Sequence, residues 1–184
     1  MSNNKTILTL LFAGLIFCMS AYAGDDKAKL KSEKNSPATE IEWLSYDEGL
    51  AQAIREGKHL FVDFTTKWCG YCKKMERTTF REPEIISMLA NNFIAVKVDG
   101  DSKKELDIDG YKISERNLTT KEFKVRGYPT FWFLDPAGTK LGAVRGYQPA
   151  ASLKNYLEFV KDKKYEEQTE TDQSEGSDNK DEKK

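Results

Sequence analysis

Leu60-Phe61-Val62-Asp63-Phe64 and, a few residues on, Trp68-Cys69-Gly70-Tyr71-Cys72 form the stretch that decides the fold. The first segment has the apolar content of a buried strand. The second places two cysteines two residues apart. A strand, a loop and a CxxC pair in this order are typical of a redox-active dithiol. The alternative is a structural disulfide, which would close too short a loop to constrain the unfolded chain much.

The two sulfurs are expected to differ in reactivity. If a helix begins at Cys69, the sulfur of that residue lies among unpaired backbone N–H groups at the positive end of the helix dipole. Cys69 is then the readily ionised thiol, and the thiolate is the nucleophile. Cys72 lies one turn further into the helix. We expect it to be better shielded and to act as the resolving thiol.

The first 23 residues have the layout of a secretory signal peptide. Lys5 precedes an apolar run over residues 7–17, and Ala21-Tyr22-Ala23 is a small-x-small cleavage site. The apolar run is shorter than the roughly 20 residues that span a bilayer, which argues against the alternative of an uncleaved membrane anchor. A lipoprotein anchor at Cys18 is disfavoured by the bulky Phe17 before it.

Cleavage after Ala23 would remove Cys18 and leave Cys69 and Cys72 as a single disulfide or dithiol. Exported compartments permit disulfides. The sequence therefore predicts an exported protein, most simply in a bacterial periplasm, with no stable membrane insertion once the signal is cleaved.

Composition limits the remaining possibilities. The chain has 29 basic and 30 acidic residues and a formal net charge of −1, so nothing indicates a nucleic-acid partner. Its 184 residues fit one domain with polar ends. We expect a flexible linker over 24–40, a folded domain over 41–161 and a disordered charged tail over 162–184, which is too polar to bury enough surface. A docking role of the tail for a basic partner is the alternative.

Helices and strands are expected to alternate between these ends. Ser45 and Glu48 form a capping-box pattern, and Gly57 is a stop signal, so we expect a helix over 46–56. Pattern and turn residues predict the other elements: strands over 59–64, 93–99, 129–134 and 140–144; helices from 69 toward 80, over 83–91 and over 119–124; a hairpin around the Asp109-Gly110 turn; and a final helix opened by Pro149 with Leu153, Tyr156, Leu157 and Val160 buried. His59 is expected to be structural or solvated.

Several linked residues give the chain a resemblance to the thioredoxin superfamily from about Ile41 to Lys161. They are Asp63 before the cysteine pair, Trp68 next to Cys69, Lys97 in the following strand, Gly-x-Pro-Thr at 127–130, and Gly146. The resemblance implies an α/β thioredoxin fold, with a central mixed β-sheet flanked by helices and here a small inserted hairpin.

The resemblance also implies a substrate-binding edge. Pro129 would follow a cis peptide bond opposite the Cys69–Cys72 pair, and the strand edge beside it would bind an extended substrate segment. Trp68, Tyr71 and Tyr128 would surround the sulfur, or pack against the domain instead.

Asp63 can be argued on physical grounds as well. Desolvation in an apolar strand should raise the pKa of this carboxyl toward neutrality, where it can exchange protons. We expect Asp63 to help deprotonate Cys72. Lys97 is expected to tune Asp63 electrostatically, with a strand lysine that merely extends to solvent as the alternative.

Two departures from cytosolic thioredoxins refine the expected function. The dipeptide between the cysteines is Gly-Tyr where those proteins have Gly-Pro, and residues 100–118 form an insertion similar to that of exported bacterial thiol:disulfide interchange proteins. We expect a periplasmic thiol:disulfide oxidoreductase that reduces or exchanges disulfides in exported proteins. An upstream thiol donor would supply its electrons.

The same resemblance implies no cofactor besides the Cys69–Cys72 disulfide and no metal. Two alternatives stay open: a non-catalytic peptide-binding or chaperone module, and a thiolate metal relay. The relay lacks the further ligands that structural zinc usually requires.

Overall fold

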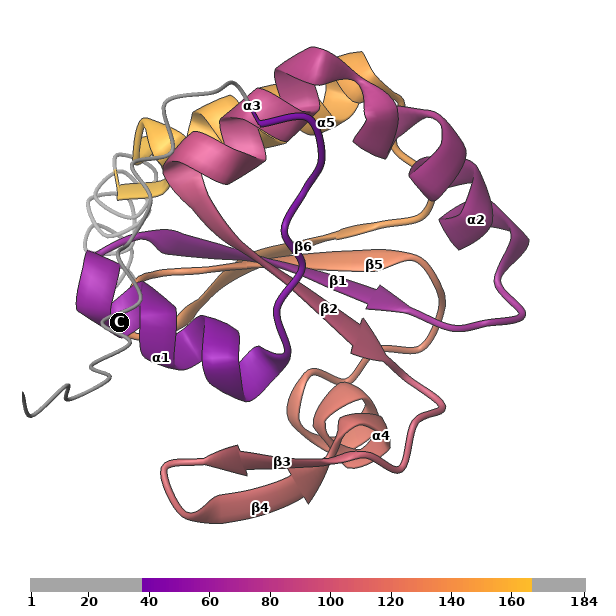
Figure 1. Cartoon of the computed structure of the whole chain (residues 1–184), viewed down its shortest axis with the longest axis vertical. Coiled ribbons are helices and arrows are strands. Elements are labelled where there is room, and N and C mark those ends of the chain that lie inside the picture. The colour runs from indigo at the N-terminus through magenta and orange to yellow at the C-terminus, as the bar shows by residue number, and fades with distance from the viewer. Residues whose placement is uncertain (1–37, 167–184) are drawn as a thin grey trace, which may run out of the picture. The chain divides into compact units, whose positions relative to one another are not determined.

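A four-stranded mixed sheet lies at the centre of the chain, as Figure 1 shows. The computed structural model describes residues 38–166, which all belong to one compact unit. The sheet has the order β2-β1-β5-β6, built from β1 (His59–Thr65), β2 (Phe93–Asp99), β5 (Thr130–Leu134) and β6 (Lys140–Arg145). β1 is parallel to β2 and antiparallel to β5, and β5 is antiparallel to β6. The mixed sheet of the predicted fold is confirmed.

The strand that precedes the cysteines is the most enclosed of the four. β1 pairs on both edges, and every residue from His59 to Phe64 is buried. The register sets Asp63 opposite Lys97 of β2 on one side and Phe131 of β5 on the other. A carboxylate is thereby fixed in the middle of the sheet.

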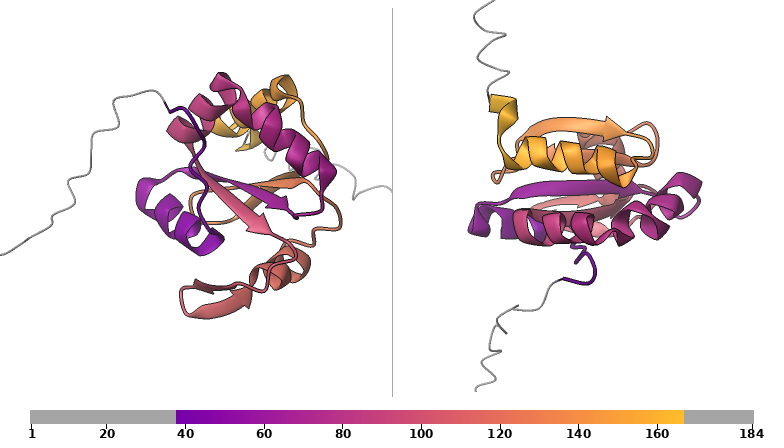
Figure 2. Two further views of the ribbon diagram at one scale, coloured as in Figure 1. Left: turned by 45° about the vertical axis from the view of Figure 1, so that its right-hand side comes forward. Right: turned by 90° about the horizontal axis from the view of Figure 1, so that it is seen from above.

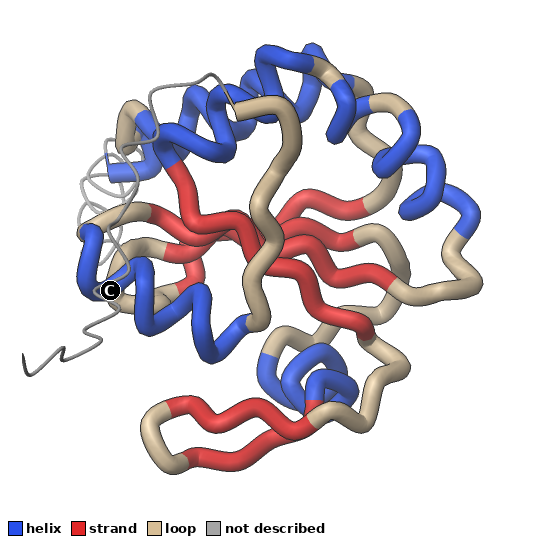
Figure 3. Tube along the Cα trace, in the orientation of Figure 1, coloured by secondary structure: helices blue, strands red, loops and turns tan. Residues whose placement is uncertain are grey.

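Helices cover both faces of the sheet (Figures 1 and 3). On one face, α2 (Gly70–Arg77), α3 (Pro83–Asn92) and α5 (Ala150–Lys161) pack over a core that includes Phe61 and Phe131. On the other face, α1 (Tyr46–Glu56) and the inserted segment pack over Leu60, Val62 and Phe64. The alternation of side chains along β1 thus supplies both cores.

The helix ends follow the capping signals of the sequence. At the start of α1, the Ser45 amide donates to Glu48 Oε2 at 3.3 Å, and Gly57 ends the helix with a φ of 64°. Glycine adopts this left-handed conformation without the steric penalty of a Cβ. Pro83 occupies the start of α3, where its missing N–H costs nothing.

The insertion is a hairpin followed by a short helix, and Figure 2 shows the hairpin outside the central sheet. Strands β3 (Glu105–Ile108) and β4 (Tyr111–Ser114) pair antiparallel, as predicted. The helix begins earlier than predicted, with α4 (Glu115–Asn117) leading into the π-helical turn η2 (Leu118–Glu122). The cause is Ser114, whose Oγ accepts from the Asn117 amide at 3.2 Å and caps the helix.

The expectation for Tyr156 needs correction, and the structure decides between the two alternatives for His59. Tyr156 of α5 is 41% exposed, because the buried stripe of this helix is narrow and consists of Leu153, Leu157 and Val160. His59 is buried and lies 2.8 Å from the Tyr165 hydroxyl through Nε2. The role of His59 is therefore structural. Its partner Tyr165 lies beyond the expected end of the domain at residue 161, and the structure describes the chain as far as Glu166.

The predicted signal peptide, nearly all of the linker and most of the charged tail lie outside the described residues. Between residues 38 and 166, no helix is long and apolar enough to cross a membrane.

Candidate active site

Cys69 is the residue that caps α2 at its N-terminus. Its Sγ accepts a hydrogen bond from the Cys72 amide at 3.0 Å, and the two sulfurs are joined in a disulfide. A backbone N–H in this position, at the positive end of a helix, stabilises a thiolate once the disulfide is reduced. The local geometry thus favours Cys69 as the ionised thiol.

The expected difference in shielding between the cysteines is wrong for the disulfide form. Cys69 is 4% exposed and Cys72 is 3% exposed, because the disulfide holds both in one helical turn with a Cα–Cα distance of 5.3 Å. What differs is their surroundings. Cys69 is flanked by the exposed side chains of Trp68 and Tyr71, whereas Cys72 borders a cavity.

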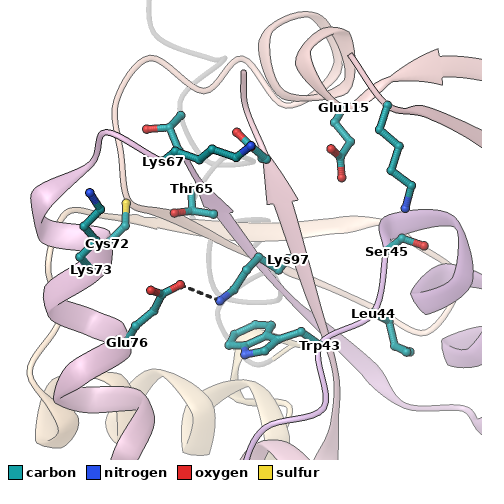
Figure 4. A pocket seen from close by; sticks show the side chains of 13 residues that line it. Trp43, Leu44, Ser45, Thr65, Lys67, Cys72, Lys73, Glu76, Lys97 and Glu115 are labelled. Atoms are coloured by element: carbon teal, nitrogen blue, oxygen red, sulfur yellow. Dashed lines mark hydrogen bonds and ion pairs between the residues drawn. The ribbon is translucent and has the colours of Figure 1, made fainter. Parts of the chain in front are cut away.

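That cavity has a volume of about 530 Å³ and is shown in Figure 4. It lies between the start of α2, the C-terminal ends of β1 and β2, and the insertion. Apolar groups such as Trp43 line part of it, and the rest of its lining carries both signs of charge: Lys67, Lys73, Lys97 and Lys104, with Glu76, Asp99 and Glu115. Cys72 therefore borders a recess that is lined by charged side chains.

Asp63 is buried in β1, with 3% of the residue exposed. Burial raises the pKa of its carboxyl to about 7; the negative charge of Glu76 adds to this rise, and Lys97 opposes it. Among the described residues, Asp63 Oδ1 has no hydrogen-bond partner. The carboxyl therefore changes its protonation near neutral pH, in the direction that the sequence predicted.

Lys97 extends from β2 into the cavity, where Figure 4 shows it meeting Glu76. Its Nζ lies 3.0 Å from Glu76 Oε1 and 4.5 Å from the ring centroid of Trp43. The lysine acts on Asp63 by charge, and Glu76 offsets that charge. Sequence reasoning missed Glu76, although its position four residues after Cys72 places both on one face of α2.

The exposed aromatic residues form two pairs beside the disulfide. Trp68 packs edge-on against Tyr128 with a centroid distance of 5.7 Å, and Tyr71 lies 6.4 Å from Tyr147. Trp68 is also held by a hydrogen bond from its Nε1 to Asp101 Oδ2 at 2.5 Å. Tyr147 and Asp101 carried no signal that sequence reasoning used, because they enter the site through tertiary contacts.

Pro129 follows a cis peptide bond from Tyr128, as the resemblance implied. Its carbonyl oxygen accepts from the Gly146 amide at 2.8 Å, so the turn after β6 fixes the segment before β5. Within residues 38–166, no three His, Cys, Asp or Glu side chains are grouped to hold a metal ion.

The buried carboxyl leads to a prediction on stability. The folded state holds the Asp63 proton more tightly than the unfolded chain does, so the free energy of unfolding should fall as pH rises from about 4 to about 7. In the oxidised protein, Asp63→Asn should remove this fall and stabilise the fold at pH 8 by on the order of 3 to 4 kcal/mol. Urea unfolding across this pH range measures both effects. The matched control is Asp109→Asn in the exposed hairpin turn, which should leave the pH dependence intact; an unchanged profile in Asp63→Asn would contradict the assignment.

A second prediction concerns the two charges that act on this carboxyl. Glu76→Gln removes a charge that raises the Asp63 pKa and frees Lys97, so the pKa should fall; Lys97→Met should raise it. NMR titration of the Asp63 carboxyl in the oxidised protein measures the shift. Shifts of the same sign in both variants would exclude the opposing roles.

Comparison with known proteins shows which family the chain resembles. The family model described as a thioredoxin-like domain matches residues 46–161. A thiol:disulfide interchange protein DsbD of Campylobacter jejuni is 32% identical over 121 residues, and a protein disulfide-isomerase of Hordeum vulgare is 28% identical over 104 residues. These matches cover 62% and 56% of this chain but 19% and 17% of the relatives, so the chain spans about a fifth of their length.

Solved structures give the same fold. A thioredoxin of Thermus thermophilus matches with a TM-score of 0.55 and 27% identity, over 66% of this chain and 87% of that one. A thioredoxin-fold protein of Helicobacter pylori matches with a TM-score of 0.57 and 24% identity, over 60% and 73%. With its matched family model, its mixed sheet and its cysteine pair at the start of α2, the chain belongs to the thioredoxin-like domain family.

Proposed function

We propose that this chain is an exported thiol:disulfide oxidoreductase that reduces or exchanges disulfides in other exported proteins. The observation that carries the proposal is the cysteine pair at the N-terminus of α2, with the Cys72 amide on Cys69 Sγ. Relatives named as thiol:disulfide interchange proteins and disulfide-isomerases support the chemistry. The signal-peptide pattern of residues 1–23 supports export.

The proposed reaction moves two electrons from the protein dithiol to a substrate disulfide. The Cys69 thiolate attacks one substrate sulfur, which forms a mixed disulfide and releases the other substrate sulfur as a thiolate that takes a proton. Cys72 then loses its proton to Asp63 and attacks Cys69 Sγ. This step closes the protein disulfide and releases the second substrate thiol. An upstream thiol donor must reduce the pair again.

Asp63 suits the second step because its pKa of about 7 lets it accept and return a proton near neutral pH. Lys97 and Glu76 are positioning residues in this scheme, since each acts on the carboxyl by charge. Trp68, Tyr71, Tyr128 and Pro129 are the proposed substrate contacts.

Trapping the mixed disulfide tests the proposal. In Cys72→Ala, the substrate should stay bound to Cys69 and appear as a covalent adduct that dithiothreitol releases. Cys69→Ser should form no adduct and should lose disulfide reduction by several orders of magnitude. A Cys69→Ser protein that keeps its function in cells would favour the peptide-binding module, and metal bound to the reduced protein would favour the relay.

We expect the couple to lie in the reducing half of the thioredoxin range, because no histidine stands between the cysteines to stabilise the Cys69 thiolate. Equilibration with glutathione buffers should give a reduction potential below about −200 mV. A clearly higher value would make the protein an oxidant instead.

A further inference from the structure

The surface around the redox disulfide carries exposed cations that have no acidic partner. Five of them come from three segments that meet at the site: Lys67, Lys73, Lys74, Arg126 and Arg145. We call these five residues the basic rim. In the described part of the chain, none of the five forms an ion pair.

Contacts around the cysteines fix the places of these cations. Lys67 stands directly before Trp68, and Lys73 directly after Cys72; both line the cavity that Cys72 borders, as Figure 4 shows. Lys74 lies with its Nζ 4.2 Å from the ring centroid of Tyr147, which itself faces Tyr71. The rim thus reaches both aromatic pairs.

The remaining two cations flank Pro129. Arg145 of β6 is the cross-strand partner of Thr130 in β5, and Thr130 is the residue after the proline. Arg126 precedes Gly127, whose carbonyl oxygen accepts from Thr130 Oγ1 at 2.8 Å. A peptide laid along this edge would therefore run between cations.

Of the acidic groups near the site, Glu115 is buried at the edge of the cavity, and the other three are engaged within the domain. Glu76 is paired with Lys97. Asp99 accepts the Asp101 amide at 3.0 Å, and Asp101 accepts from Trp68 while also facing Arg116. The charge of the whole chain is −1, so the basic rim is not part of a general excess of positive charge.

We propose, resting on the proposed function, that the physiological partner presents its disulfide in a segment flanked by carboxylates. The exposed rings of Trp68 and Tyr71 would contact the apolar part of that segment, and the basic rim would pair with its acidic residues. Complementary charge of this kind raises association rates by about 10- to 1,000-fold at low ionic strength. The rim would select which exported disulfides are reduced, while the cysteines perform the same exchange on any of them.

Matched peptides test the inference. Each carries the same internal disulfide ring, with flanks of Glu, Gln or Lys, and the rate of its reduction by the reduced protein is followed at about 20 mM salt. The Glu-flanked peptide should react at least about tenfold faster than the Lys-flanked one. The difference should shrink to about twofold or less at 1 M salt, where the screening length is about 3 Å. Equal rates at low salt would overturn the inference.

Charge-matched variants locate the effect. The triple variant Lys67→Glu, Arg126→Glu, Arg145→Glu should reverse the peptide preference. The control Arg55→Glu, Lys112→Glu, Lys164→Glu changes the net charge equally at exposed positions on α1, on β4 and after α5, and should keep the preference. If the control variant shifts the peptide preference as much as the rim variant does, the basic rim is not the cause of that preference.

A binding measurement separates this inference from the proposed function. Fluorescently labelled peptides with alanine in place of both cysteines are titrated with the oxidised protein at low salt, and anisotropy reports binding. If no disulfide peptide is reduced but the Glu-flanked peptide still binds more tightly, the proposed function fails and the rim stands. If all disulfide peptides are reduced at equal rates, the function stands and the rim fails.

Discussion

The burial of one carboxyl in the central strand is the constraint on which the site depends. Asp63 lies in β1 with neighbours on both edges, and removal from water raises its pKa to about 7. A fold selected for stability alone would place an apolar residue at such a position, because an unpaired buried carboxyl costs free energy whenever it is ionised. The sheet tolerates this cost in the strand that leads to the cysteine pair, and under the proposed function the carboxyl serves there as a proton carrier.

Two charges near Asp63 act on the pKa of its carboxyl in opposite directions. The charge of Lys97 lowers the pKa of Asp63 against the larger effect of burial, and Glu76 weakens that lowering by pairing with the same ammonium group at 3.0 Å. Trp43 covers the lysine from the other side. Because the carboxyl is buried, its protonation depends on the charges of two side chains, Lys97 and Glu76, which line the cavity.

Much of this arrangement could be predicted from local sequence. The apolar run before the cysteines, the capping box at Ser45 and the turn at Gly57 act within a few residues, and the structure has those elements where the patterns placed them. The start of α4 is harder to predict, because it is set by the Ser114 cap and the sequence pattern favours a later start. Asp101 and Tyr147 gain their places in the site from contacts between distant segments, which no periodic pattern reveals. The helical spacing from Cys72 places Glu76 on the same face of α2, but its pairing with Lys97 is a contact between distant segments. The burial of His59 likewise depends on Tyr165, more than a hundred residues away.

The insertion is joined to the site through a short series of contacts. Arg116 of α4 faces Asp101, Asp101 holds the Trp68 indole, and Gly100 approaches Tyr128 so closely that a Cβ there would overlap the tyrosine hydroxyl. The insertion therefore shapes the aromatic surface beside the disulfide, although it contributes nothing to the strand that carries Asp63. Substitutions in the insertion can therefore change the aromatic surface without altering β1 or the cysteine pair, so related chains are free to differ in that surface while sharing the same buried carboxyl and the same disulfide.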